Sequence, residues 1–229
     1  MPAKTTTGPM TMASTVRVWD LPTRIFHWAL AATVLGLLGT AWAPGDWVDV
    51  HAKLGYAALA LLLFRVLWGV VGGRWSRFAS FLYTPASTLS YLRGRRHPDH
   101  LVGHSPLGAL SVFGMLAVLL AQVGTGLVSD NEEAFTGPLN RYVANATGLA
   151  ATWYHRAIGQ WLVVALVVLH VAAILFYVVK KHENLVRPML GGDKEAAAGT
   201  ESSADGEGHR LLALVLFAAC VLAVWWVVR

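Results

Sequence analysis

Five apolar segments, each close to the length of a membrane-spanning helix, constrain this chain more than any other feature. About 20 apolar residues in a helix cross the hydrocarbon core of a bilayer, where the backbone must satisfy its own hydrogen bonds. The chain has 229 residues, of which 55% are hydrophobic and only 14% are charged. It therefore predicts an all-α integral membrane protein with a four-helix transmembrane bundle and a fifth, C-terminal transmembrane helix. The predicted spans are residues 25–43, 51–71, 106–128, 155–179 and 211–228.

Charged residues in the connections between these spans predict their orientation. The 44–50 connection carries Asp46 and Asp49, whereas the 72–105 connection carries five arginines. Because cytoplasmic loops are enriched in Lys and Arg, residues 72–105 are predicted to be cytoplasmic. The 131–154 connection is mainly acidic, and Lys180 and Lys181 follow the fourth span, so the sides alternate as required. The expected location is a bacterial inner membrane, with a cytoplasmic N-terminus and a periplasmic C-terminus. The net charge of +5 is then explained by orientation, and no nucleic-acid partner is expected.

Composition divides the chain into four parts. Residues 1–15 are polar and Thr-rich and predict a disordered N-terminal extension. Residues 16–190 hold the first four spans and form the membrane domain. Residues 191–209 are rich in Ala, Gly, Ser and acidic residues without apolar periodicity, which predicts a flexible linker. Residues 210–229 form the additional transmembrane helix, which the linker is expected to tether loosely.

Four histidines lie at predicted span ends or inside a span. His155 and His170 are on one helix, and at 100° per residue they point to within about 60° of each other and lie roughly 22 Å apart along the axis. His27 begins the first span and His51 begins the second. With the predicted orientation, His27 and His170 share the cytoplasmic level, and His51 and His155 share the periplasmic level. We call these the inner pair and the outer pair.

Paired histidines on facing helices favour axial ligation of haem iron. Zinc takes three or four protein ligands and non-haem iron typically adds a carboxylate, and neither pattern is present at these depths. Two imidazoles fill both axial positions, which suits electron transfer. The chain has a single cysteine, Cys220, so a CxxCH attachment motif is absent and the haems would be non-covalent, b-type groups. The alternative is that these histidines lie at the interface and bond to headgroups or carbonyls.

Several basic residues are candidates for binding the haem propionates. Arg65 lies fourteen residues after His51, roughly 21 Å deeper and at the level of the inner pair, although it could also snorkel to the cytoplasmic interface. Arg24 and Arg17 are further inner candidates for a propionate or a lipid headgroup. The outer candidates are Lys53 and Arg156.

The remaining polar groups near the spans indicate a binding role less clearly. Gln122 and Gln160 could hydrogen-bond a quinone, but such residues more often bond across helices. His97, His100 and His104 have a spacing that could bind a metal, but Pro98 and the surrounding loop residues favour a solvated loop.

Several motifs resemble a known family. They are VRVWDLPTRIFHW at residues 16–28, HxxxGY from His51, RVLWG from Arg65 and ENLVR at residues 183–187. Over about residues 16–195 the chain resembles the prokaryotic cytochrome b-561 and nickel-iron hydrogenase cytochrome b subunit family. The resemblance implies a four-helix bundle that holds two haems b, with ligands corresponding to His27, His51, His155 and His170. It also implies electron transfer between the quinone pool and a hydrogenase, a formate dehydrogenase or a soluble cytochrome.

Together these features predict a di-haem b cytochrome that relays electrons across the membrane. Its expected partners are membrane lipid, quinone or quinol, and a redox protein such as a c-type cytochrome or a dehydrogenase or hydrogenase subunit. The chain would serve as the electron-transfer subunit of a membrane oxidoreductase, and whether it is itself an enzyme stays open. One alternative is a quinone oxidoreductase that acts directly on superoxide, attracted by Lys53 and Arg156. Another is a haem-free membrane scaffold or transporter whose histidines relay protons.

Overall fold

The computed structural model describes residues 14–95, 100, 102–132 and 135–229. Five of its helices are long and apolar enough to cross a membrane, which confirms the predicted all-α membrane fold. The predicted N-terminal extension lies outside the described residues, apart from Ser14 and Thr15, which begin a strand. In chain order the elements are β1 (Ser14–Arg17), α1 (Leu21–Trp42), α2 (Val48–Val71), η1 (Arg74–Ser76), η2 (Phe78–Ser80), α3 (Pro85–Leu92), α4 (Pro106–Val128), η4 (Asn140–Tyr142), α5 (Asn145–Trp153), η5 (Tyr154–Gly159), α6 (Gln160–Lys180), α7 (Val186–Gly191), β2 (Asp193–Ala196) and α8 (Glu207–Val228).

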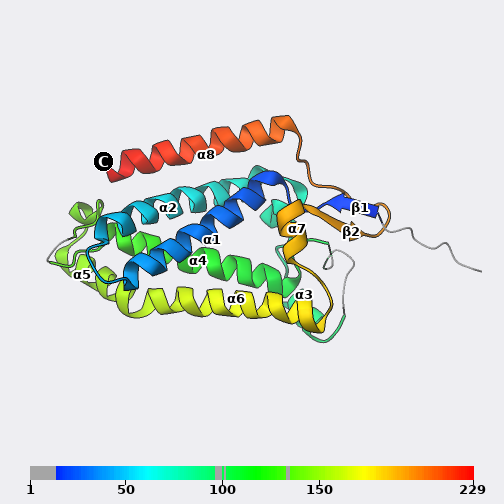
Figure 1. Cartoon of the computed structure of the whole chain (residues 1–229), viewed down its shortest axis with the longest axis horizontal. Coiled ribbons are helices and arrows are strands. Elements are labelled where there is room, and N and C mark those ends of the chain that lie inside the picture. Colours follow the sequence, from blue (N-terminus) through cyan, green and yellow to red (C-terminus); the bar gives the residue numbers. More distant parts are fainter. Residues whose placement is uncertain (1–13, 96–99, 101, 133–134) are drawn as a thin grey trace, which may run out of the picture.

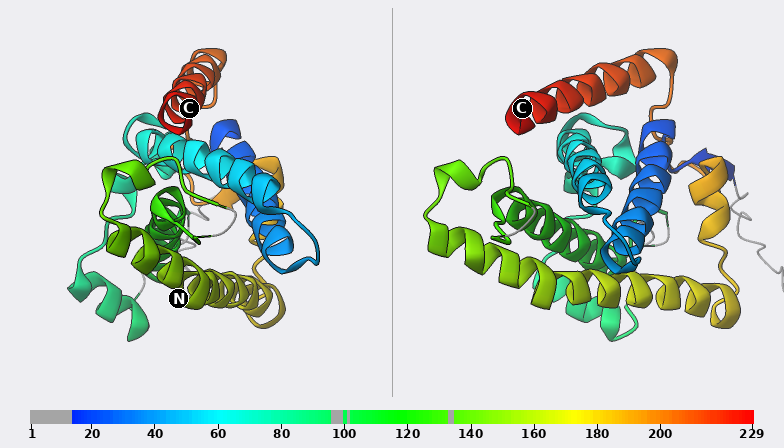
Figure 2. Two further views of the ribbon diagram at one scale, coloured as in Figure 1. Left: turned by 90° about the vertical axis from the view of Figure 1, so that its left-hand side faces the viewer. Right: turned by 60° about the vertical axis from the view of Figure 1, so that its left-hand side comes forward.

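The helices α1, α2, α4 and α6 form the bundle, and α8 lies outside it (Figure 1). The fourth span is longer than predicted, because α5, the π-helical η5 and α6 run continuously from Asn145 to Lys180. Figure 2 shows α8 beside α2, on the side of the bundle away from α6.

A buried carboxylate fixes the start of α1. Asp20 is fully buried, and its Oδ1 accepts hydrogen bonds from the Thr23 amide (2.8 Å) and from Trp68 Nε1 (3.1 Å). Its Oδ2 accepts a hydrogen bond from Ser76 Oγ at 2.6 Å. The residue therefore caps α1 and at the same time ties it to the end of α2 and to η1. Pro22 lies in the first turn of α1, where its missing amide hydrogen is not needed.

The segment after α7 is folded against the start of the chain. Strands β1 and β2 pair antiparallel, with Ser14 opposite Ala196 and Arg17 opposite Asp193. Further along, the Ser203 amide donates to Arg17 O (2.7 Å) and its hydroxyl donates to Val18 O (2.9 Å). We call β1, β2 and residues 201–205 the clasp. The composition of residues 191–209 predicts a flexible linker, and the structure corrects this prediction, because these long-range backbone bonds leave no periodic signal in the sequence.

Asp205 joins the clasp to both α1 and α8. It accepts hydrogen bonds from the Leu21 amide (3.0 Å), from Arg17 Nη1 (2.6 Å) and from Arg210 Nε (3.2 Å). Burial alone would raise the pKa of Asp205, but the hydrogen bonds from Arg210, Leu21 and Arg17 outweigh it and lower the pKa below its usual value. Arg17 also pairs with Asp193 at 2.6 Å, and the hydrogen bond to this carboxylate raises the arginine pKa. The linker was expected to tether α8 loosely. The hydrogen bonds of Asp205 to Leu21, Arg17 and Arg210 correct this expectation.

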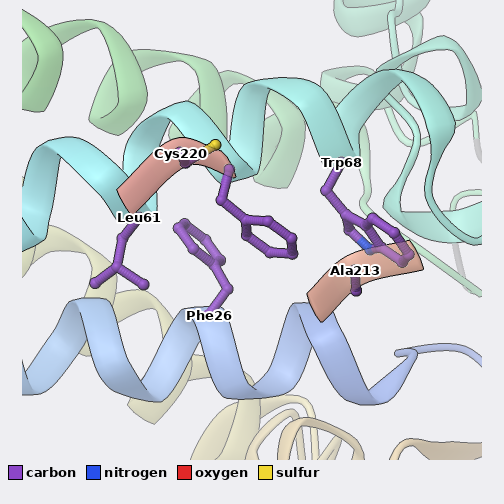
Figure 3. Packing of buried hydrophobic residues seen from close by; sticks show 6 residues of the cluster. Phe26, Leu61, Trp68, Ala213 and Cys220 are labelled. Atoms are coloured by element: carbon purple, nitrogen blue, oxygen red, sulfur yellow. The ribbon is translucent and has the colours of Figure 1, made fainter. Parts of the chain in front are cut away.

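The helix α8 packs along α2 through a buried apolar cluster. In Figure 3, Trp68 lies near Ala213 and Leu61 lies near Cys220, so α8 runs antiparallel to α2. The Phe64 ring contacts both the Phe26 ring (6.4 Å between centroids) and the Phe217 ring (5.9 Å). The cluster consists of Phe26, Leu61, Phe64, Trp68, Ala213 and Cys220. α8 is thus a packed element of the membrane fold.

We expect the substitution Asp20→Ala to destabilise the protein by about 3–5 kcal/mol, because it leaves the buried Trp68 Nε1 and Ser76 Oγ without their acceptor. Equilibrium unfolding in detergent measures the loss of free energy. The matched control is Asp49→Ala, which removes an exposed carboxylate and is expected to cost less than about 1 kcal/mol. Equal losses for the two variants would contradict the structural role of Asp20.

Candidate functional site

The structure brings the four span histidines together as two pairs. The His27 ring on α1 and the His170 ring on α6 have centroids 6.3 Å apart and an interplanar angle of 51°. The His51 ring on α2 and the His155 ring on η5 have centroids 6.1 Å apart and an angle of 80°. The pairing is the one that sorting by depth predicts.

The ring separations fit one metal ion between the two imidazoles of each pair. A direct hydrogen bond between ring nitrogens would bring the centroids to about 5.2 Å. With a metal–nitrogen bond of about 2.0 Å on each side, and about 1.15 Å from nitrogen to ring centre, two trans ligands have centroids about 6.3 Å apart. The observed values of 6.3 and 6.1 Å agree with the second arrangement. The spacing of each pair is therefore compatible with one metal ion between its two rings.

Hydrogen bonds orient the two outer rings so that Nε2 is available as a ligand. The Thr40 hydroxyl donates to Gly36 O at 2.8 Å, so its oxygen can accept the Nδ1–H of His51 at 3.0 Å. On the opposite side, His155 Nδ1 lies 2.9 Å from Gln122 O, which can only accept. For His155 the acceptor-only carbonyl places the proton on Nδ1 and leaves Nε2 unprotonated, and the same tautomer of His51 is compatible with its contact to Thr40. Such partners fix the tautomer and the orientation of a ligating histidine.

His155 lies in a π-helical turn, which the sequence does not predict. The Gln122 side chain on α4 donates from Nε2 to His155 O at 3.0 Å, and this bond supports the widened turn. Gly159 makes room for it, because a Cβ at this position would meet Gln122 Oε1 at 1.8 Å. π-Turns inside helices are frequent at functional sites. The angle between His155 and His170 was predicted with a rotation of 100° per residue. This rotation does not apply in the π-helical turn that contains His155.

Gln122 and Gln160 both bond across helices, which confirms the favoured interpretation of these residues. Gln160 Oε1 accepts a hydrogen bond from Trp42 Nε1 of α1 at 3.2 Å, and Gln160 Nε2 donates to Arg156 O.

A cavity of about 560 Å³ surrounds the outer pair. It is lined by residues of α1, α2, α4, η5 and α6, with His51 and His155 among them. Gly126 lets the His155 ring approach α4, since a Cβ there would lie 3.1 Å from His155 Cε1. The volume is in the usual range for cofactor sites, and most of the lining side chains are apolar. The cavity can therefore hold a large flat ligand between the two rings.

The basic residues suggested by the sequence occupy different surroundings. Arg156 is exposed and lines the outer cavity, whereas Lys53 is exposed and is absent from the described lining. Arg24 is partly buried and donates from Nη1 to Leu190 O. Arg17 belongs to the clasp, so its suggested role at a propionate or headgroup is corrected.

Arg65 is buried in the bundle, with 3% of its surface exposed. Its guanidinium lies over the Phe78 ring, 4.7 Å from the centroid, and its Nη1 is buried without a hydrogen-bond partner among the described residues. The alternative of a snorkelling interfacial arginine does not fit this burial.

The loop histidines differ from the prediction of a solvated loop. His97 lies outside the described residues, but His100 is buried and its ring packs edge-on against Tyr83 at 5.0 Å. The His104 ring lies between Trp19 (4.7 Å) and Phe81 (4.3 Å). Burial, and then the charge of Arg65, lower the pKa of His104 to about 3. The structure corrects the prediction because aromatic side chains distant in the sequence cover this loop.

Comparison with known proteins connects this geometry to a family. A family model described as prokaryotic cytochrome b561 matches residues 18–192. A probable Ni/Fe-hydrogenase B-type cytochrome subunit of Azotobacter vinelandii is 26% identical over 213 residues, which cover 77% of this chain and 87% of that protein. The similarly named protein of Cupriavidus necator is 27% identical over 210 residues, with coverages of 76% and 85%. A probable Ni/Fe-hydrogenase 1 B-type cytochrome subunit of Escherichia coli is 23% identical over 223 residues, with coverages of 81% and 93%. No solved structure gives a significant match. The matched family region ends before α8 begins.

We expect Gly159→Ala to destabilise the protein by about 1–3 kcal/mol, because the added methyl group displaces the Gln122 side chain that holds the π-turn. Thermal and chemical unfolding in detergent measure this effect. Gly124→Ala on α4 is the matched control, since a Cβ there meets no atom within 4 Å, and we expect it to be neutral or slightly stabilising. A stable Gly159→Ala variant would show that the close contact does not matter.

Proposed function

The chain belongs to the prokaryotic cytochrome b561 family, and on this basis we propose that it is a di-haem b cytochrome that carries electrons across the membrane between the quinone pool and a redox partner protein. The family match confirms the resemblance that the motifs of residues 16–195 carry. Membership makes the chain a membrane b-type cytochrome of electron transport. The haem number, the ligands, the quinone and the direction across the membrane belong to the proposal.

The observation that carries the proposal is the pair of ring separations, 6.3 and 6.1 Å, at two levels of one bundle. His27 and His170 would hold one haem b, and His51 and His155 would hold the other. When bound, each haem would supply a one-electron couple. Thr40 and the Gln122 carbonyl orient the His51 and His155 rings, and the cavity beside these rings is lined mostly by apolar side chains.

Basic residues at each level would bind the propionates. Arg65 and Arg24 are the inner candidates, and burial of Arg65 without a partner for Nη1 supports its assignment. Arg156 is the better supported outer candidate, because it lines the cavity around His51 and His155, and Lys53 is the other. Opposite charge near a carboxylate in an apolar site stabilises its ionised form.

A hydrogenase is the favoured redox partner, since the named relatives are probable hydrogenase cytochrome subunits. A dehydrogenase subunit or a c-type cytochrome remains an alternative. Quinone would exchange electrons with one of the two haems. We propose a bacterial inner membrane location in which the inner pair faces the cytoplasm, because the arginine-rich connection 72–105 lies at that end of the bundle.

We expect His170→Ala and His51→Ala each to reduce the haem content from two to one per chain, because each removes one axial ligand from a different pair. Haem assay and the ferrous b-type absorption bands of the purified protein measure this loss. His209→Ala, at the start of α8, is the control and is expected to keep both haems. Purified wild-type protein without bis-histidine b-type bands would refute the di-haem assignment and favour a haem-free membrane protein.

We expect alkaline phosphatase fused after Arg229 to be active in cells, because this enzyme folds only outside the cytoplasm and the C-terminus is proposed to be periplasmic. The same fusion at Gly94, in the arginine-rich connection, is expected to be inactive. Phosphatase activity per amount of fusion protein in intact cells is the measurement. The reverse pattern would invert the proposed orientation and place the inner pair at the periplasmic side.

A further inference from the structure

Two polar groups near the inner pair are buried without partners. Arg65 Nη1 on α2 and His104 Nδ1, just before α4, have no hydrogen-bond partner among the described residues. An unpaired buried donor is destabilising, and more so when it carries charge. Native structures rarely leave two such groups in one region unless something else satisfies them.

Arg65 and His104 both contact one pair of packed phenylalanine rings, Phe78 and Phe81. The Arg65 guanidinium lies over the Phe78 ring at 4.7 Å, the Phe78 and Phe81 rings are 5.9 Å apart, and the Phe81 and His104 rings are 4.3 Å apart. After burial, the Arg65 charge is the second cause that lowers the pKa of His104. Arg65 and His104 therefore face a common region, although α2 and the loop before α4 are far apart in sequence.

Asp20 is the acidic residue whose charge acts on Arg65, but both of its oxygens accept hydrogen bonds from other residues. The charge of Asp20 acts on Arg65 through space, but its Oδ1 accepts from Thr23 and Trp68 and its Oδ2 accepts from Ser76. Asp20 thus serves the start of α1, and Arg65 Nη1 keeps an unused N–H.

His104 suits a place beside an arginine because its ring is neutral there. Burial and the Arg65 charge lower the pKa of His104 to about 3, so the ring does not repel the guanidinium at neutral pH. A neutral imidazole with a protonated Nδ1 offers one donor. Arg65 and His104 then present two N–H donors with a single positive charge, which matches the two oxygens and the single negative charge of a carboxylate.

Arg65 lies at the level of His27, one of the two inner histidines. The Phe64 and Phe26 rings are in contact at 6.4 Å, and these residues directly precede Arg65 and His27 in the sequence. Arg65 is therefore at the level where His27 and His170 would hold a haem, and it could receive one of the carboxylates of that haem.

We propose that Arg65 Nη1 and His104 Nδ1 together bind a carboxylate, a propionate of the haem held by the inner pair. This inference rests on the proposed function and adds His104 to it as a positioning residue for that haem. It also gives the loop before α4 a role that its sequence pattern does not indicate.

The test measures how fast the inner haem leaves the full-length protein. In a His51→Ala background, which is expected to retain only the inner haem, haem transfer to excess apomyoglobin is followed by absorption. We expect Arg65→Gln and His104→Leu each to accelerate the transfer about tenfold or more, since a charge-assisted hydrogen bond contributes about 1.5–3 kcal/mol. His104→Asn, whose amide can donate from near the Nδ1 position, is expected to restore most of the retention. The matched control Arg74→Gln removes an arginine that pairs with Glu201 outside this cluster and should leave the rate unchanged.

Haem with esterified propionates identifies the bound group. After reconstitution with the dimethyl ester, wild-type, Arg65→Gln and His104→Leu proteins are expected to lose haem at the same rate. Resonance Raman bands of propionate bending should shift in the Arg65→Gln and His104→Leu proteins but not in the Arg74→Gln protein.

Two results would overturn the inference. An unchanged rate in His104→Leu with natural haem would remove His104 from the site. An equal acceleration with natural and esterified haem would show that the pair binds another anion, such as a free carboxylate or phosphate. Both results leave the bis-histidine spectrum intact, so they are distinguishable from failure of the proposed function, in which the wild-type protein holds no such haem.

Discussion

Buried polar groups must find partners inside this bundle, because the surrounding hydrocarbon offers none, and much of the structure follows from that constraint. Asp20 illustrates it at the start of α1, where a fully buried carboxylate collects donors from α1, α2 and η1. The outer histidines illustrate it at the other end, where Thr40 and Gln122 accept their Nδ1 protons. The same hydrogen bonds that stabilise these groups also hold them in the orientation that ligation requires.

The four proposed ligands depend on different kinds of support. His51 and His155 are held by hydrogen bonds, by a π-turn and by close glycine contacts, next to a cavity of about 560 Å³. The inner pair lies beside a region where Arg65 and His104 still lack partners. In the proposed function the protein alone provides partners for Nδ1 of both outer rings, while the cofactor provides the partner for Arg65 Nη1 and His104 Nδ1.

The helix α8 adds a second layer to one side of the family bundle. It lies beyond the matched region 18–192, yet it packs on α2 through Ala213 and Cys220 and is joined to α1 through Asp205. The clasp connects this addition to the same short segment that contains Asp20. The start of α1 therefore links the bundle, the clasp and α8, although Leu21 lies 184 residues from Asp205 in the sequence.

From the sequence we could predict the membrane class, the five spans and the sorting of His27, His51, His155 and His170 into two levels. These features depend on apolar length and on axial rise, which are local properties of a helix. The sequence did not reveal that the His104 ring packs between aromatic rings, that Gln122 supports a π-turn at His155, or that β2 and residues 201–205 join β1 in the clasp. Each of these depends on contacts between residues far apart in the chain, and such contacts produce no periodic pattern that the sequence could display.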